Sequence, residues 1–262
     1  MIALFAGLLS TAVAASAQQQ VLPVRADPFS AEVGLYHQSL DHGYSDWDGA
    51  DVRLMYHGAQ AAPFATVSSQ TRREGRQASY GLGSYLFLAP ALYAIADFSV
   101  ATGGTAVFFP RLRWDATLFA DTHVVPGLVV DAGITYVSFG SGSSGTIASL
   151  GPILYRGPWI ASALAHVNHD GPTGATTGSG EGSVQYGAEG RAWSGITVSA
   201  GHEAYQVIAL TPFDAQFTNI GGSVFRQQWL GRRTSLLGRL EYQDKLTAYR
   251  RVGMSLSYRV TY

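Results

Sequence analysis

The chain of 262 residues has no cysteine, which excludes disulfide frameworks, thiol nucleophiles and cysteine-ligated zinc sites. It also has little charge, since Asp, Glu, Lys and Arg make up 13% of the residues, where a soluble domain usually carries about 25%. Lysine occurs once, at Lys245. With 17 basic against 18 acidic residues there is no basic surplus to release counterions from phosphates, so we expect no nucleic-acid partner.

Long hydrophobic runs are missing as well. Beyond the N-terminus, Gly, Ser, Asp or Arg interrupts every apolar stretch before it reaches the roughly 18 residues of a membrane helix. The one compact apolar run, from Ile2 to about Val13, ends in Ala15-Ser16-Ala17, the A-x-A pattern of a secretory cleavage site. We therefore predict a signal peptide over 1–17 and a short periplasmic tail over 18–28, although no Lys or Arg precedes the run.

What the chain does have is glycine, 31 residues, and a hydrophobic pattern of period two. Alternate positions of the last segment are apolar, and the intervening positions are small or polar. The apolar set is Val252, Met254, Leu256, Tyr258, Val260 and Tyr262. The other set is Arg251, Gly253, Ser255, Ser257, Arg259 and Thr261. The same alternation occurs around 111–118, 128–136, 184–191 and 239–243, which indicates an all-β protein.

Clusters of turn residues divide the chain into about 14 candidate strands, within a range of 12 to 16. We place them near 30–40, 49–57, 63–72, 77–88, 91–101, 107–120, 127–139, 146–155, 159–168, 181–192, 195–205, 216–229, 233–243 and 249–262. Alternate connections are short, and the other set contains the longest, including a Gly- and Thr-rich loop expected over 170–180. Short turns at one rim and long loops at the other are typical of outer-membrane barrels.

A soluble β-sandwich would also alternate, but its outer faces would carry more Lys, Asp and Glu than this chain does. A one-residue slip of the last strand would turn Arg251 and Arg259 toward lipid, at about 2–4 kcal/mol for an Arg at the bilayer midplane. Open strand edges in hydrocarbon would leave backbone groups unpaired. We therefore predict one domain over 29–262, a closed antiparallel transmembrane β-barrel of the bacterial outer membrane, surrounded by outer-membrane lipid.

The chain ends on Tyr262, an aromatic residue on the apolar face of the last strand. Such an end resembles the signal that the barrel-insertion machinery reads in outer-membrane proteins. We expect that machinery to be a partner through the C-terminal strand.

Four stretches resemble the YaiO family of outer-membrane β-barrel proteins. They are Gly43-Tyr44-Ser45-Asp46-Trp47, Asp51-Val52-Arg53-Leu54, the segment 108–114 (FFPRLRW) and the segment 252–259 (VGMSLSYR). The resemblance implies an accessory component associated with bacterial polysaccharide glycosyltransferases. Because no tetratricopeptide scaffold precedes the barrel here, a link to periplasmic polysaccharide-export components would require a separate partner.

The polar face of each strand would line the lumen, which gives a set of candidate lumen or substrate-contact residues. Its charged members, able to hydrogen-bond sugar hydroxyls, are Arg53, Asp97, Arg111, Arg113, Asp115, Asp131, Glu189, Arg191, Arg239, Glu241, Arg251 and Arg259. Its aromatic members, platforms for sugar rings, are Tyr85, Tyr93 and Phe119. The alternative interpretation is that the charges pair across the barrel and brace a lumen that passes nothing.

Catalysis would need a nucleophile, a base and an acidic residue held together. The candidates are Ser162 with His166, His169 and Asp170, and Ser199 with His202 and Glu203. Their spacing within a strand does not establish a triad, and neither metal-ligand nor phosphate-binding motifs occur, so we expect no enzyme, metal or cofactor. The leading hypothesis is an accessory or conduit for envelope exopolysaccharide export. The alternatives are a diffusion porin for small polar solutes and an outer-membrane lipid hydrolase or deacylase.

Overall fold

A computed structural model describes residues 28–103, 108–139, 142–203, 217–246 and 248–262. The expected signal peptide over 1–17, and all but the last residue of the expected tail over 18–28, lie outside the described residues. Among the described residues there is no helix that could cross a membrane.

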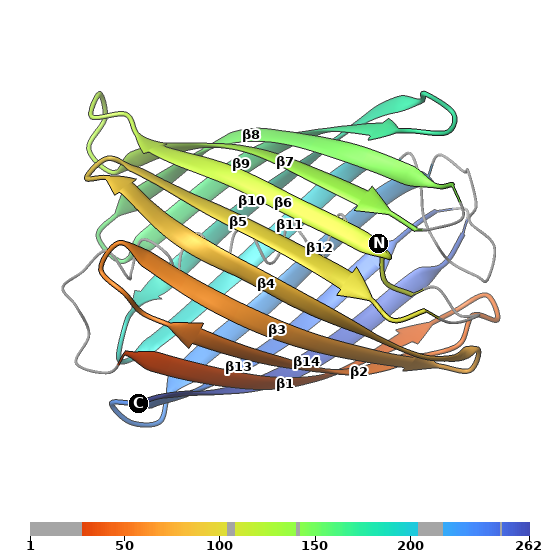
Figure 1. The fold of residues 1–262 in the computed structure, drawn as a ribbon, viewed down its shortest axis with the longest axis horizontal. Helices are drawn as coiled ribbons and strands as arrows, with labels where there is room; N and C mark the ends of the chain where they lie inside the picture. The colour runs from red at the N-terminus through yellow and green to blue at the C-terminus, as the bar shows by residue number, and fades with distance from the viewer. Residues whose placement is uncertain (1–27, 104–107, 140–141, 204–216, 247) are drawn as a thin grey trace.

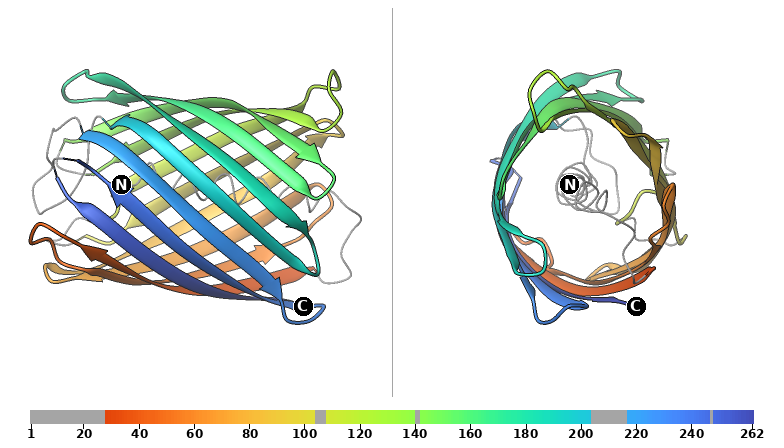
Figure 2. Two further views of the ribbon diagram at one scale, coloured as in Figure 1. Left: turned by 180° about the vertical axis from the view of Figure 1, so that it is seen from behind. Right: turned by 90° about the vertical axis from the view of Figure 1, so that its left-hand side faces the viewer.

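Fourteen antiparallel strands, each bonded to its neighbours in sequence, form a closed barrel in which β1 also pairs with β14 (Figures 1 and 2). The strands are β1 (Phe29–Leu40), β2 (Trp47–Tyr56), β3 (Ala61–Arg72), β4 (Gly75–Ala89), β5 (Leu92–Ala101), β6 (Leu112–Asp121), β7 (Leu128–Ser138), β8 (Ser144–Arg156), β9 (Trp159–Asp170), β10 (Thr176–Ala188), β11 (Ala192–Glu203), β12 (Phe217–Trp229), β13 (Thr234–Asp244) and β14 (Arg250–Thr261). The predicted all-β closed barrel and its strand number are confirmed.

The loop expected over 170–180 is much shorter in the structure, so that prediction was wrong in extent. Strand β10 begins at Thr176 and pairs with β9 from Thr176–His169 onward. The turn over 171–175 is closed by Asp170, whose carboxylate accepts a hydrogen bond from the backbone N–H of Thr173 at 2.9 Å. Gly174 adopts a φ of +68°, which a side chain would strain. Ladder pairing thus extends the strand into a segment whose Gly and Thr content suggested a loop.

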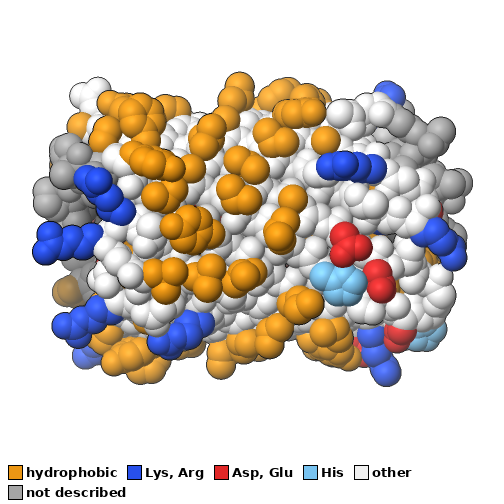
Figure 3. All heavy atoms as spheres, turned by 90° about the horizontal axis from the view of Figure 1, so that it is seen from below, with side chains coloured by type: hydrophobic (Ala, Val, Ile, Leu, Met, Phe, Trp, Pro, Cys, Tyr) orange, Lys and Arg blue, Asp and Glu red, His pale blue; other side chains and the backbone are white. Residues whose placement is uncertain are grey.

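The outer surface carries the apolar half of the period-two pattern. Leu35, Leu82, Leu150 and Met254 are more than half exposed, although they are large hydrophobic residues in the middle of strands. In Figure 3 hydrophobic side chains spread over the middle of the wall, and charged side chains gather toward its two ends. A band of this kind suits hydrocarbon between two polar interfaces.

Several inward-facing glycines lie directly opposite large side chains of the next strand. Tyr36 faces Gly49, Phe64 faces Gly83, and Phe225 faces Gly195. A Cβ on Gly83 would lie 2.4 Å from Cζ of Phe64, so the ring occupies the space that a side chain would fill. The rings therefore lie against the barrel wall.

The two rims differ as the sequence predicts. One rim, here called the short-turn rim, holds the ends of β1 and β14 near Phe29 and Tyr262, and its connections are at most six residues long, the longest being 122–127. The other, the long-loop rim, holds the longest connections, 102–111 and 204–216.

Placing a charge on the outer face should destabilise the barrel. Leu82 is 68% exposed on the outward face near the middle of β4, so Leu82→Arg should lower the free energy of unfolding in lipid vesicles by about 2–4 kcal/mol. Ser68→Arg provides the matched control, because Ser68 faces inward opposite Asp51 and should cost far less. Equal losses for the two variants would contradict the assignment of the outer face to lipid.

Candidate functional site: the charged lumen

The inward face near the short-turn rim is lined with aromatic and aliphatic side chains, here called the inner aromatic belt. Tyr93 and Phe119 stack with ring centroids 4.5 Å apart and an interplanar angle of 4°. The buried members of the belt are Met55, Ala62, Tyr85, Tyr93, Phe119, Val129, Ile153, Ile160 and Trp193. Each comes from a strand end beside this rim, so the period-two pattern puts apolar groups inside as well as outside here.

Above this belt the inward arginines concentrate on five adjacent strands, β13, β14, β1, β2 and β3. We call this part of the wall the arginine sector. It holds Arg53, Arg72, Arg239, Arg251 and Arg259. Glu32, Asp51 and Glu241 share the sector, and Glu241 Oε1 lies 3.4 Å from Arg251 Nη2.

Carboxylates face the lumen from β5, β6, β7, β9 and β10, across the barrel from the arginine sector. This carboxylate sector holds Asp97, Asp115, Asp131, Asp170 and Glu181. Its inward arginine, Arg113, binds Asp115 through two hydrogen bonds of 2.5 and 2.7 Å, so that charge is neutralised within the wall. The lumen is therefore electrically polarised from one side to the other.

Water reaches this wall. Glu32, Arg53, Asp97 and Arg259 are partly exposed although all four face inward. Between the charged groups the inward positions are mostly Ser, Thr and Gly, for example Ser68, Ser255 and Ser257. Small polar side chains keep internal volume open and supply hydrogen-bonding groups to whatever fills it.

A second cluster lies on the inner wall near the long-loop rim. The guanidinium of Arg72 lies between two rings, 3.9 Å from the centroid of Trp47 and 4.3 Å from that of Phe108. Arg251 lies 5.5 Å from the same Trp47 ring. Gln77 holds Phe108 in place, because its Oε1 accepts a hydrogen bond of 2.6 Å from the Phe108 backbone N–H. Part of the 102–111 connection is thus fixed against the inner wall.

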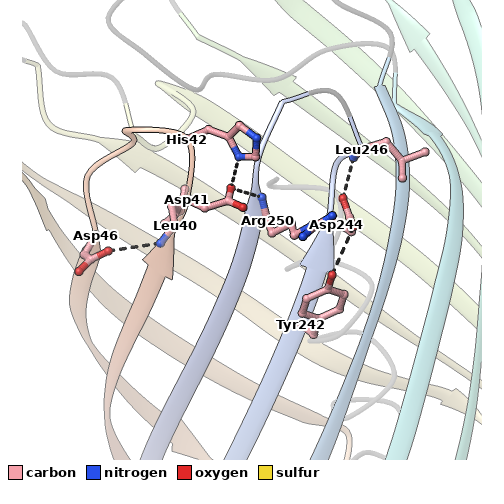
Figure 4. Close-up of polar contacts among 8 residues, drawn as sticks. All are labelled: Leu40, Asp41, His42, Asp46, Tyr242, Asp244, Leu246 and Arg250. Atoms are coloured by element: carbon pink, nitrogen blue, oxygen red, sulfur yellow. Dashed lines mark hydrogen bonds and ion pairs between the residues drawn. The ribbon is translucent and has the colours of Figure 1, made fainter.

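The connections at this rim are also tied across the β1–β14 seam (Figure 4). Asp41 Oδ1 accepts a hydrogen bond of 2.6 Å from the backbone N–H of Arg250 and lies 2.5 Å from His42 Nδ1. At the end of β13, the other neighbour of β14, Asp244 accepts hydrogen bonds from the Leu246 N–H at 2.9 Å and from Arg250 Nε at 3.2 Å. The N–H of Arg250 and the ring of His42 hold the pKa of Asp41 below its ordinary value.

The family model described as YaiO membrane beta barrel domain matches residues 29–206. The chain belongs to the YaiO family. The match covers most of the described barrel and bears out the resemblance seen in the sequence, and it agrees with a location in the bacterial outer membrane. None of the curated proteins compared with the chain matches it.

Solved structures share the fold of this YaiO barrel at low identity. The CymD monoaromatic hydrocarbon channel has a TM-score of 0.62 at 10% identity, with 90% of this chain and 89% of that chain covered. The Pseudomonas putida toluene transporter TodX gives 0.58 at 10% identity, covering 93% and 90%. A bacterial polysaccharide outer membrane secretin gives 0.54 at 7% identity, covering 90% and 99%. The YaiO barrel therefore has the architecture of outer-membrane channels.

Most of the lumen residues predicted from the sequence do face inward in the YaiO barrel. They are Arg53, Tyr85, Tyr93, Asp97, Arg113, Asp115, Phe119, Asp131, Arg239, Glu241, Arg251 and Arg259. The three aromatic residues lie in the inner aromatic belt and are buried, so their ring faces are not open to the lumen as platforms for sugar rings.

Three predicted lumen residues lie elsewhere. Glu189 and Arg191 belong to the turn between β10 and β11, where Gly190 has a φ of +78° and ends the strand period. Arg111 is exposed in the connection before β6. In each case the prediction continued the inward–outward alternation of side chains beyond the end of the strand.

Sequence reasoning missed other inward charges, namely Glu32, Asp51, Arg72, Asp170 and Glu181. Glu32 shares the parity of Gly34 and Tyr36, so assigning the two faces of β1 would have found it. Arg72 is the last residue of β3, and only its contact with Trp47 and Phe108 shows its place.

Where the structure describes their side chains, the catalytic candidates are not hydrogen-bonded to one another as triads. Ser162 Oγ is 2.8 Å from Ser183 Oγ, and Asp170 bonds its own turn. His202 contacts Thr218 at 3.1 Å on the outward face, whereas Ser199 faces inward. Within the described ranges, clusters of His, Asp and Glu that could hold a metal ion are absent.

Lowering the pH should weaken the hydrogen bond between Asp41 and the Arg250 N–H that joins the ends of β1 and β14 at the long-loop rim. The pKa of Asp41 is lower in the folded protein than in the unfolded chain, so its stabilising effect is complete above about pH 4 and is lost as the pH falls through the folded pKa. We expect hydrogen exchange of the Arg250 amide, corrected for intrinsic rates, to speed up there. Asp41→Asn should show weaker protection with no such pH step; an identical step in this variant would contradict the role of Asp41.

Proposed function

We propose that this YaiO barrel is a passive conduit for hydrated carbohydrate chains in envelope exopolysaccharide export. The observation that carries the proposal is the polarised, partly exposed inner wall, in which the arginine sector faces the carboxylate sector across Ser, Thr and Gly. Guanidinium groups donate hydrogen bonds and carboxylates accept them, and a sugar hydroxyl does both. A chain rich in hydroxyls can therefore exchange its water for either side of the wall at little cost.

The same wall disfavours an apolar cargo. A hydrocarbon passing along the lumen would displace water from Arg53, Arg259, Asp97 and Asp115 without replacing its hydrogen bonds. Dehydrating charged groups in this way costs several kcal/mol for each ion. We therefore do not extend to this chain the cargo named for CymD and TodX, even though the fold is similar.

Two further observations favour a carbohydrate chain over small solutes. The YaiO resemblance implies an association with polysaccharide glycosyltransferases, and one of the similar barrels is a polysaccharide secretin. The short-turn rim, which carries both strand ends, would face the periplasm. Periplasmic polysaccharide-export components are then the partners expected at that rim, and the insertion machinery is expected to engage β14 during assembly.

The barrel is proposed to act without chemistry of its own. Among the residues that could have formed a hydrolase site, Ser162 Oγ pairs with Ser183 Oγ, the Asp170 carboxylate bonds its own turn, and Ser199 and His202 lie on opposite faces of β11. Membership in a family of membrane barrels is consistent with transport in place of catalysis.

Sugar flux into proteoliposomes tests the conduit. We expect vesicles that contain the purified barrel to admit maltotriose and maltohexaose, measured by osmotic swelling against protein-free vesicles. Ser255→Trp places a bulky ring on the inward face of β14 and should slow entry of the hexasaccharide several-fold. Met254→Trp, on the outward face one residue away, should leave the rate unchanged.

The outcomes separate the hypotheses. Entry of maltotriose without maltohexaose would favour a diffusion porin for small polar solutes and contradict a conduit for chains. Equal effects of the two Trp variants, or entry of neither sugar, would contradict transport through the described lumen.

A further inference from the structure

Three charged side chains form one row across adjacent strands of the arginine sector. Glu32 on β1 is the direct register partner of both Arg53 on β2 and Arg259 on β14. All three face inward and are partly exposed. We call them the Arg–Glu–Arg row; it lies next to the inner aromatic belt, two or three residues from the short-turn ends of its strands.

Arg53 is held in a fixed position on the wall. Its guanidinium lies 4.1 Å from the centroid of the Phe64 ring, and Phe64 in turn occupies the space over Gly83. Nη2 of Arg53 lies 3.5 Å from the hydroxyl of Tyr85, a long hydrogen bond. A guanidinium stacked on a ring loses little side-chain entropy when it binds, because its plane is already set.

The row is not neutralised internally. Neither arginine lies within ion-pair distance of Glu32 among the described residues, and the side chain of Arg259 makes no hydrogen bond to any residue that the structure describes. Nε of Arg53 is buried and makes no hydrogen bond to the residues that the structure describes. An unpartnered buried donor costs about 1–3 kcal/mol, so the hydrogen-bonding capacity of this guanidinium is not fully used within the wall.

Small and polar side chains flank the row. The next inward layer consists of Gly34, Ser257 and Asp51, and the layer toward the rim consists of Ser30, Thr261 and Met55. Ser257 Oγ lies beside Gly34, where a Cβ would meet it at 2.7 Å. A sugar ring over the row would have the Ser257 hydroxyl and the Asp51 carboxylate as hydrogen-bond partners on the side away from the rim.

We infer that the Arg–Glu–Arg row is a binding site for an acidic sugar, a uronate, within the lumen. The carboxylate of the sugar accepts hydrogen bonds from the guanidinium groups of Arg53 and Arg259, and its ring hydroxyls donate to Glu32. This inference rests on the proposed conduit for its carbohydrate, and it adds that the transported chain carries carboxylates.

Glu32 decides between a uronate and a simple anion. Inorganic phosphate has the charge for two guanidinium groups, but its oxygens would lie beside the Glu32 carboxylate, and like charges at that distance repel. A uronate carries a single negative charge, so Glu32 repels it less than phosphate, and its ring hydroxyls can donate hydrogen bonds to Glu32. The row therefore favours the sugar acid over the free ion.

Calorimetric titration of the detergent-solubilised barrel tests the site without transport. We expect methyl glucuronide to bind about ten-fold more tightly than methyl glucoside or inorganic phosphate, a difference of about 1.4 kcal/mol. Arg53→Gln and Arg259→Gln should each weaken glucuronide binding about ten-fold. The control is Arg232→Gln in the β12–β13 turn, which is exposed outside the lumen and should change nothing.

Phe64 is a positioning residue, because its ring holds the Arg53 guanidinium. Variants of Phe64 distinguish this role from a role in folding. Phe64→Leu removes the ring under Arg53 and should lower the preference for glucuronide over glucoside, whereas Phe64→Tyr should restore it. All variants are first shown to be folded by their retained β-sheet circular dichroism and heat-modifiable migration in gels.

Each result bears on the site. Equal affinities for glucuronide and glucoside, or binding that survives both arginine variants, would overturn the inference. Phosphate binding as tight as glucuronide would reduce the row to a general anion site and overturn the assignment to a sugar. If glucuronide fails to bind while maltohexaose still enters vesicles, the acidic-sugar site is wrong and the conduit stands; failure of both removes the conduit too.

Discussion

Hydrocarbon offers no hydrogen-bond partner to a peptide group, so a sheet that crosses the outer membrane must pair its first strand with its last. In this chain β1 and β14 form that pair along eleven register positions. Once the barrel is closed, every side chain faces either lipid or the lumen, and the pleat alternates the two. Almost all charge that the strands carry near mid-depth must then gather inside, which explains how a chain with so few charged residues can still have a strongly charged interior.

Closure of the barrel requires charged side chains to face the lumen, but it does not require positive and negative side chains to lie on different sides of the lumen. Random placement along the polar faces would mix the signs, and cross-lumen pairing would brace the barrel. Instead, the inward arginines concentrate on β13 to β3, where they share the wall with Glu32, Asp51 and Glu241, and β5 to β10 carry carboxylates with Arg113 as their inward arginine. Separation of this kind leaves guanidinium and carboxylate groups facing water, where they can hydrogen-bond a solute.

The sequence predicted the class of fold, the strand number and most inward residues, because a period of two and the cost of charge in lipid act locally and leave a readable pattern. Arg53, Asp115 and Arg259 could be assigned to the lumen from parity alone. Glu189, Arg191 and Arg111 could not, because the end of a strand is decided by ladder pairing and turn conformation with neighbours. The stacking of Arg72 between Trp47 and Phe108 joins β2, β3 and a connection 36 residues further on, and no local pattern shows it. The row of Glu32 with Arg53 and Arg259 likewise depends on the register between three strands, two of which are at opposite ends of the chain.

The glycines that face Tyr36, Phe64 and Phe225 have a consequence for assembly. Each ring lies over a glycine of one neighbouring strand. Moving that strand by two residues preserves the lipid and lumen faces, but it would set Tyr36 or Phe225 against a side chain in either direction, and Phe64 against Tyr85 in one direction and Gly81 in the other. Alternation alone cannot discriminate against such a shift, whereas a ring and its facing glycine can. The three pairs therefore favour the native register between three pairs of strands during assembly, against both shifts for Tyr36 and Phe225 and against one of the two for Phe64.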